Sequence, residues 1–115
     1  MNISIVIASG NKGKVKEFRE LLADLPLNLI SQPEGCEVDE SGTNFIENAR
    51  LKALAVSHLT GECALADDSG LGVEALNGLP GIYSARYADT DIARINKLLK
   101  ELAPFNNRNA TFTSA

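Results

Sequence analysis

Residues 3–14 read ISIVIASGNKGK, and this stretch decides the fold of the chain. Its first half, residues 3–8, is short, β-branched and almost wholly apolar, which is typical of a strand buried on both faces of an α/β sheet. Residues 9–11 have the composition of a turn. Apolar side chains then recur at helical spacing over residues 15–25, until Pro26 ends the pattern. The chain therefore opens with the strand–turn–helix unit of an α/β protein, and we expect a mixed, twisted sheet flanked by helices.

The same alternation continues through the sequence. Extended segments are predicted at residues 27–30, 63–66, 71–76 and 110–113, and helices at 44–59 and from Asp89 or Thr90 to Pro104. Thr43 is predicted to cap the first of these helices, and Gly61 to end it. Residues 81–87 are expected to form a loop. The apolar side chains of the last helix are expected to face the protein interior; they are Ile92, Ile95, Leu98, Leu99 and Leu102.

Length and composition restrict the class of protein. The 115 residues suit a single domain, 1–115, and the net charge of −4 disfavours a nucleic acid polymer or an anionic membrane as partner. No apolar run approaches a membrane span, and no basic segment precedes a long apolar one as in a signal peptide. Two cysteines and one histidine are too few for a structural zinc site. We expect a cytoplasmic protein with reduced thiols.

The first candidate site is the turn between the first strand and helix. Small residues there allow backbone N–H groups to approach an anion, while the helix N-terminus and two lysines add positive charge. Polyphosphate is the expected ligand, although the spacing is not that of a Walker A loop. The alternative is an ordinary turn with solvated lysines. The turn consists of Ser9, Gly10, Asn11, Lys12, Gly13 and Lys14.

Acidic residues form the second candidate site. Asp67 and Asp68 follow an apolar strand, at the position where open α/β sheets place ligands, and only one of two successive side chains is expected to face the site. Carboxylates suit Mg²⁺, which bridges substrate phosphates. The alternative is a turn or helix-capping cluster. Asp39 and Glu40 could supply a further metal ligand, or could belong to an ordinary acidic surface loop.

Other polar residues are less specific. Arg86 ends a glycine-containing loop and could bind a phosphate through two hydrogen bonds, or could be merely exposed. Asn44, Asn48 and Lys52 are spaced four apart on one helix face, which is either solvated or the wall of a cleft. His58, near the end of that helix, is expected at the surface rather than in catalysis.

Four sequence blocks resemble the inosine triphosphate pyrophosphatase family, in the right order and spacing over nearly the whole chain. The first two are SGNKGK at residues 9–14, followed by Glu17, and FIENA at residues 45–49, followed by Lys52 and Ala53. The other two are long and specific: ADDSGL at residues 66–71 and GLPGIYSARY at residues 78–87. The similarity is greatest to the bacterial branch, which hydrolyses dITP, ITP and XTP.

This resemblance implies a reaction, a cofactor and site residues. Water attacks the α-phosphate of a non-standard purine nucleoside triphosphate, releasing the monophosphate and pyrophosphate. Asp68 is implied as general base close to Mg²⁺, and Asp39 or Glu40 as the second metal-associated acid. Ser69 and the turn from Ser9 to Lys14 are implied to hold the substrate, and Arg86 its phosphates. The family also implies a homodimer.

The sequence departs from the family pattern at two points. Asn44 precedes Phe45 where the family usually has threonine, which is expected to change the helix cap. The chain also resembles only the N-terminal part of the longer family members, without the later Phe-Gly-Tyr-Asp and Ser-His-Arg segments that grip the purine. An alternative function is therefore a catalytically impaired nucleotide- and Mg²⁺-binding or assembly module. A third is a related hydrolase that prefers another base.

Overall fold

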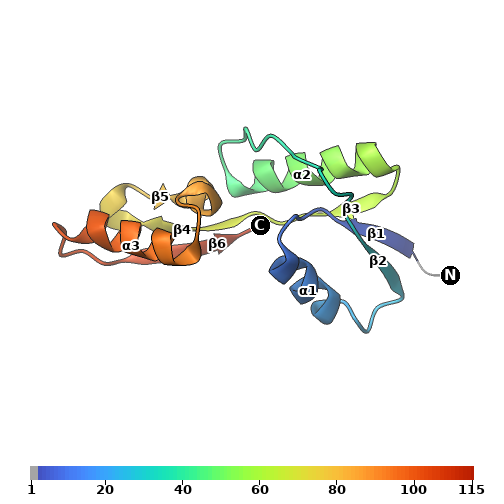
Figure 1. The fold of residues 1–115 in the computed structure, drawn as a ribbon, viewed down its shortest axis with the longest axis horizontal. Helices are drawn as coiled ribbons and strands as arrows, with labels where there is room; N and C mark the ends of the chain where they lie inside the picture. Colours follow the sequence, from blue (N-terminus) through green and yellow to red (C-terminus); the bar gives the residue numbers. More distant parts are fainter. Residues whose placement is uncertain (1–2) are drawn as a thin grey trace. The chain divides into compact units, whose positions relative to one another are not determined.

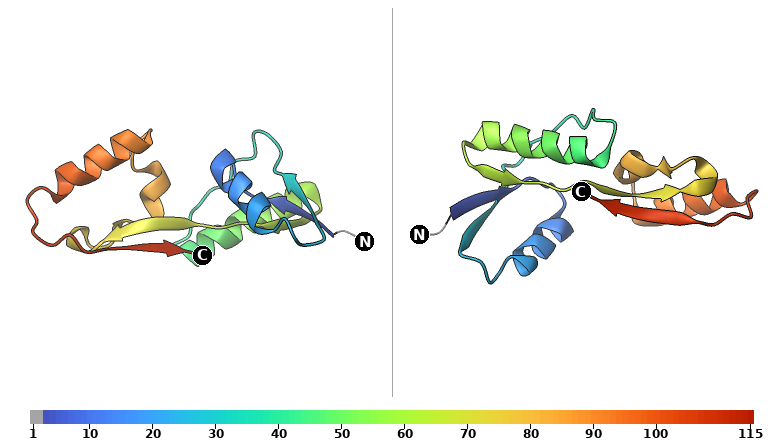
Figure 2. Two further views of the ribbon diagram at one scale, coloured as in Figure 1. Left: turned by 90° about the horizontal axis from the view of Figure 1, so that it is seen from below. Right: turned by 180° about the vertical axis from the view of Figure 1, so that it is seen from behind.

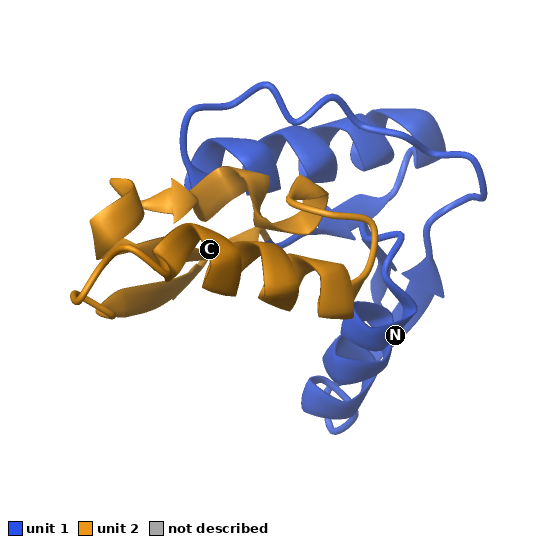
Figure 3. Cartoon of the chain, turned by 60° about the vertical axis from the view of Figure 1, so that its left-hand side comes forward, with its two compact units in different colours: residues 1–67 blue, residues 68–115 orange. Residues whose placement is uncertain are grey.

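A computed structural model describes residues 3–115, and the chain divides into two compact units, Met1–Asp67 and Asp68–Ala115 (Figure 3). Helices and strands alternate in the first unit, and the second unit combines strands with 3₁₀ helices and an α-helix, which confirms the predicted α/β class. The strands belong to two sheets of three strands each, one in each unit. As predicted, the chain contains both parallel and antiparallel strands, because one sheet is parallel and the other is antiparallel.

The first unit is built around a parallel sheet. Its central strand is β1 (Ile3–Ile7), which pairs on one side with β2 (Leu27–Ser31) and on the other with β3 (Cys63–Leu65). Figures 1 and 2 show α1 (Lys12–Leu21) and α2 (Phe45–Thr60) on opposite sides of this sheet. Because the strands are parallel, their carboxyl ends lie at one edge.

The core of this unit lies along β1 and α2. Val6 and Ile7 are at most 1% exposed although their side chains point to opposite faces, so the end of β1 is covered on both sides as predicted. Ala8 and Val56 complete the buried apolar set. This packing fixes the point at which the chain leaves β1.

The beginning of α2 corrects one prediction. Asn44, rather than Thr43, is the N-cap, and its Oδ1 accepts a hydrogen bond from Glu47 N at 2.8 Å. Thr43 instead donates from its backbone N and its Oγ1 to the Glu47 carboxylate, at 2.7 and 3.1 Å. Glu47 therefore bonds to both residues before the helix, in a variant of the capping box. Gly61 ends the helix as predicted, with a φ of 71°.

We expect replacement of Glu47 by Gln to weaken the acid sensitivity of the fold. The hydrogen bonds from the backbone and side chain of Thr43 lower the pKa of Glu47 from its ordinary value of 4.5. A pKa lowered by folding contributes stability that is complete above pH 4.5 and is lost as the pH falls through the folded pKa. Urea unfolding at pH 7, 4.5 and 3 should therefore show a smaller loss below pH 4.5 in Glu47→Gln than in the wild type. Equal losses would contradict this role.

The second unit contains the antiparallel sheet. Its central strand β4 (Ser69–Val73) pairs with β5 (Leu79–Pro80) and with β6 (Ala110–Ser114). The extended segment predicted at 71–76 ends at Val73, because η1 (Glu74–Leu76) is a 3₁₀ turn before the left-handed Asn77 and Gly78. The expected loop at 81–87 is largely a 3₁₀ helix, η2 (Gly81–Arg86).

The last helix, α3 (Asp91–Leu102), is capped by Thr90. The prediction that its apolar side chains all face inward is wrong for Ile92, Ile95 and Leu99, which are 73%, 58% and 55% exposed. Among the described residues of this unit, the buried apolar side chains of the core are Val73 and Leu102. Leu79 and Phe112 of the sheet are also exposed, so apolar side chains of both the helix and the sheet remain uncovered in this unit.

Candidate functional site

Two of the predicted site segments start at the same edge of the parallel sheet. The chain leaves β1 through Ser9 and leaves β3 towards Asp67, and Ala8 N donates to Leu65 O at 2.8 Å just before both exits. The turn at residues 9–14 and the first residue of the acid pair therefore follow neighbouring strand ends. This is the edge at which open α/β sheets bind ligands.

The turn itself is organised by Asn11. Its Oδ1 caps α1 by accepting hydrogen bonds from Gly13 N at 2.9 Å and Lys14 N at 3.2 Å, and Ser9 Oγ accepts from Asn11 N at 3.1 Å. These two amides of the first helical turn are thus already engaged by a side chain, which the sequence did not predict. The positive charge of the turn resides on Lys12, Lys14 and the partial charge at the helix N-terminus.

An ion pair fixes the position of Lys14. Its Nζ lies 3.2 Å from Asp67 Oδ2 and 3.3 Å from Asp67 Oδ1, and both side chains are half-buried. Sequence reasoning identified the acid pair but not this contact, because residues 14 and 67 are brought together only by the pairing of β1 with β3. Asp67 therefore places a cation beside the turn.

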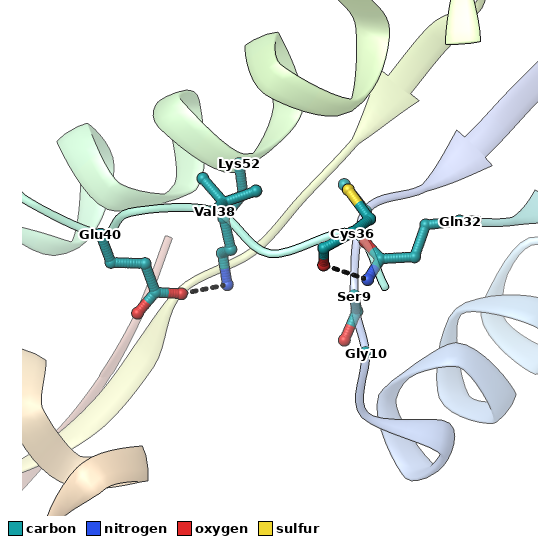
Figure 4. A pocket seen from close by; sticks show the side chains of 8 residues that line it. Ser9, Gly10, Gln32, Cys36, Val38, Glu40 and Lys52 are labelled. Carbon is teal, nitrogen blue, oxygen red and sulfur yellow. Dashed lines mark hydrogen bonds and ion pairs between the residues drawn. The ribbon is translucent and has the colours of Figure 1, made fainter. Parts of the chain in front are cut away.

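A pocket of about 240 Å³ opens next to this turn (Figure 4). Across it, Glu40 Oε1 lies 3.5 Å from Lys52 Nζ, with Ser9 and Gly10 on the other side. Asp39 is exposed and does not line the pocket, so the structure distinguishes the two neighbouring acids. The lining residues are Ala8, Ser9, Gly10, Gln32, Cys36, Val38, Glu40 and Lys52.

The polar stripe of α2 is solvated only at its start, where the N-cap Asn44 is exposed. Asn48 is fully buried, and the Lys52 side chain is only 15% exposed. His58, in contrast, is exposed in the last turn of the helix, as expected. Lys52 is a pocket residue that the four-residue spacing of the stripe could have identified.

The carboxylates of this chain are chemically suited to Mg²⁺. Among residues 3–115, no group of three or more His, Cys, Asp or Glu side chains could hold a metal ion. Mg²⁺ is usually held by one or two carboxylates together with water and substrate phosphates, so a pocket carboxylate such as Glu40 fits that kind of site.

In the second unit, Asp68 and Ser69 are held by the antiparallel sheet. Asp68 exchanges backbone hydrogen bonds with Ala115 at 2.9 and 2.8 Å, which extends the pairing of β4 with β6. The Asp68 residue is 7% exposed, and Ser69, the first residue of β4, is half-buried. The backbone of this acid is therefore fixed by regular structure.

Arg86 lies at the end of η2 and is exposed, with its guanidinium 5.5 Å from the centre of the Tyr83 ring. Ser84 holds η2 against β4, because its Oγ accepts from Leu71 N at 3.0 Å and donates to Gly81 O at 2.6 Å. The serine of the GLPGIYSARY block is therefore structural in this unit.

The predicted site residues are thus divided between the two units. The first unit brings Ser9, Gly10 and Glu40 together around the pocket and pairs Lys14 with Asp67. The second unit contains Asp68, Ser69 and Arg86.

No described helix is long and apolar enough to span a membrane.

Comparison with known proteins gives a consistent result. The sequence profile of the Ham1 family matches residues 5–115. The dITP/XTP pyrophosphatase of Prochlorococcus marinus (strain NATL1A) is 61% identical over 114 residues, covering 99% of this chain and 58% of that protein. That of Gloeobacter violaceus is 49% identical over 111 residues, covering 96% of this chain and 57% of the relative. The chain therefore spans less than two thirds of these relatives.

Solved structures agree with the sequence comparison. A HAM1 protein from Coxiella burnetii superimposes with a TM-score of 0.87 at 44% identity, covering 97% of this chain and 60% of the other. The Staphylococcus aureus Ham1 protein gives a TM-score of 0.81 at 44% identity, with 96% and 60% covered. The family resemblance and the fold predicted from it are both confirmed.

Proposed function

Because this chain belongs to the Ham1 family, we propose that it hydrolyses dITP, ITP and XTP to the nucleoside monophosphate and pyrophosphate, with Mg²⁺ as cofactor. The relatives named above as dITP/XTP pyrophosphatases support this choice of substrates. The observation that carries the proposal is the ion pair that places Lys14 beside the Ser9–Asn11 turn. A fixed cation at the start of a helix suits the polyphosphate of a nucleotide.

The polyphosphate is bound in this proposal by the turn from Ser9 to Lys14, with Ser69 and Arg86 as further substrate-binding residues. Lys12 and Lys14 supply full positive charges, and Arg86 can bind two phosphate oxygens at once. Cations fixed before the substrate arrives stabilise the charge that develops on the phosphates during hydrolysis.

Glu40 is a proposed ligand of Mg²⁺ because it lines the pocket, and Asp68 is proposed as a ligand by analogy with the family. Asp39 is less suited because it is exposed outside the pocket. When bound, the ion offsets the negative charge of the phosphates and orients them. Lys52 holds the Glu40 carboxylate at the pocket, since the two side chains form an ion pair.

The proposed general base is Asp68. Its carboxylate accepts a proton from the attacking water, which becomes bonded to the α-phosphorus while pyrophosphate leaves. The buried backbone pairing with Ala115 holds the residue in one place, as general base catalysis requires. We further propose a homodimeric, cytoplasmic enzyme, by analogy with the family.

Two measurements test this function together. Pyrophosphate release from ITP and XTP should require Mg²⁺, should stop with EDTA, and should exceed release from ATP and from a pyrimidine triphosphate. In water enriched in ¹⁸O, the label should appear in the monophosphate, because the water oxygen attaches to the α-phosphorus.

Other outcomes separate the alternatives. Label in the pyrophosphate would contradict attack at the α-phosphate. Higher activity on a pyrimidine triphosphate would indicate another base preference. Binding of ITP and Mg²⁺ without any turnover would indicate the non-catalytic nucleotide-binding module.

A further inference from the structure

The polar stripe of α2 has a structural feature that the proposed function does not use. Asn48 is 0% exposed, so a primary amide lies in the interior of the first unit. One helical turn later, Lys52 pairs with Glu40 at 3.5 Å. Both side chains therefore meet the acidic segment that precedes the helix, residues 39–43.

The contact between this segment and the helix is close. Gly42 N donates a hydrogen bond of 2.8 Å to Asn48 Oδ1. A Cβ added at Gly42 would lie 2.6 Å from that Oδ1 and 2.7 Å from Glu47 Cβ, which is closer than real Cβ atoms approach other atoms. Only glycine fits here without a shift, and the backbone two residues after Glu40 is fixed against α2.

Stability alone does not explain an asparagine at this position. Burial of an amide is unfavourable unless the group is hydrogen-bonded, and no partner for Asn48 Nδ2 is found among residues 3–115. Leucine has a similar size and would bury no polar group. The property that asparagine adds is the acceptor that holds Gly42.

We propose that Asn48 is a positioning residue that sets the place of the Glu40 carboxylate. It holds Gly42, Gly42 holds the backbone of residues 40–42, and the Glu40 carboxylate thereby lies beside Lys52, on the side of the pocket opposite Ser9 and Gly10. This inference rests on the proposed function, in which Glu40 binds Mg²⁺. Asn48 acts through Glu40 and does not itself touch the metal or the nucleotide.

Asn48→Leu removes the acceptor, and Gly42→Ala displaces the backbone from the other side of the same contact. Residues that orient a metal ligand typically change metal affinity or activity about 10–100-fold when mutated. We expect the half-saturating Mg²⁺ concentration for pyrophosphate release from ITP to rise about tenfold or more in both variants, while KM for ITP at saturating Mg²⁺ changes less than about twofold. The control Asn96→Leu, at an exposed position of α3, should match the wild type.

A binding measurement makes the test independent of turnover. Mn²⁺ affinity, measured by electron paramagnetic resonance with α,β-imido-ITP present, should fall by the same factor in both variants. Glu40→Gln should lower the affinity as well, and adding Asn48→Leu to it should produce little further loss, because the two residues act through one ligand.

The outcomes are distinguishable from failure of the proposed function. Wild-type Mn²⁺ affinity in folded Asn48→Leu and Gly42→Ala chains overturns the inference. It is also overturned if adding Asn48→Leu to Glu40→Gln lowers the Mn²⁺ affinity by the full factor seen for Asn48→Leu alone. If Asn48→Leu does not fold, Gly42→Ala decides by the same criterion. A wild-type chain that hydrolyses no triphosphate overturns the proposed function instead, whatever the affinities of the variants are.

Discussion

Replacement of Asp68 by Asn is expected to lower kcat for ITP hydrolysis by about 10²–10⁴-fold, the usual contribution of a positioned general base. The amide has the size of the carboxylate but cannot accept a proton from water. The backbone pairing of Asp68 with Ala115 does not involve the side chain, so the antiparallel sheet should remain intact. Circular dichroism and the unfolding midpoint check that it does.

The pH dependence distinguishes loss of the base from loss of binding. In the wild type, kcat should fall on the acidic side as the essential carboxylate becomes protonated, and in Asp68→Asn the residual rate should lose this limb. KM at saturating Mg²⁺ should change less than kcat. Asp89→Asn, which neutralises an exposed aspartate of the same unit, serves as the control and should retain the wild-type profile. A retained acidic limb in Asp68→Asn would assign the base to another residue.

Most of the secondary structure could be predicted because local signals determine it. The apolar run of β1 and the glycine that ends α2 define their elements directly in the sequence. The error at the start of α2 lies between two neighbouring local solutions. Thr43 and Asn44 are both good N-caps, and Asn44 is used because Thr43 bonds to the Glu47 carboxylate.

The candidate site could be predicted only as a set of motifs. The turn at residues 9–14 and the acid pair were evident, because unusual residue types cluster at strand ends. The partners of these residues come from long-range packing. The contact of Lys14 with Asp67 depends on the register of β1 and β3, and the choice of Glu40 over Asp39 depends on which carboxylate meets Lys52.

Residue spacing likewise does not predict which side chains are buried. The four-residue spacing of Asn48 and Lys52 placed them on one helix face, but it did not determine whether that face meets solvent or the acidic segment. Likewise, the periodicity of α3 is that of an amphipathic helix, yet Ile92, Ile95 and Leu99 are exposed, because periodicity does not measure how much surface is available to cover them.

Replacement of Lys14 by Met should produce the second large effect, a fall in kcat/KM for ITP of about 10²–10³-fold. This is the usual loss when one preorganised group that stabilises developing charge is removed. Methionine retains the length and apolar stem of lysine but lacks the ammonium that Asp67 holds at 3.2 Å. The initial rate of pyrophosphate release as a function of ITP concentration measures the effect.

Lys16 provides the matched control, because it lies on the same helix and is exposed. Lys16→Met removes the same charge from the chain as Lys14→Met. If net charge alone attracts the nucleotide, the two variants should lose activity equally, and the loss should disappear at high salt. A loss confined to Lys14→Met indicates a cation that acts at a fixed position.

The ion pair adds a quantitative requirement to this prediction. If Asp67 acts by placing Lys14, then Asp67→Asn should lower kcat/KM in the wild type but have little effect once Lys14 is methionine. Additive losses would mean that Asp67 contributes through some other contact. Asp24→Asn, at an exposed position of the same unit, controls for the change in charge. If the losses in Asp67→Asn and Lys14→Met are not additive, and if Asp24→Asn has no effect, the Lys14–Asp67 contact belongs to the phosphate-binding site.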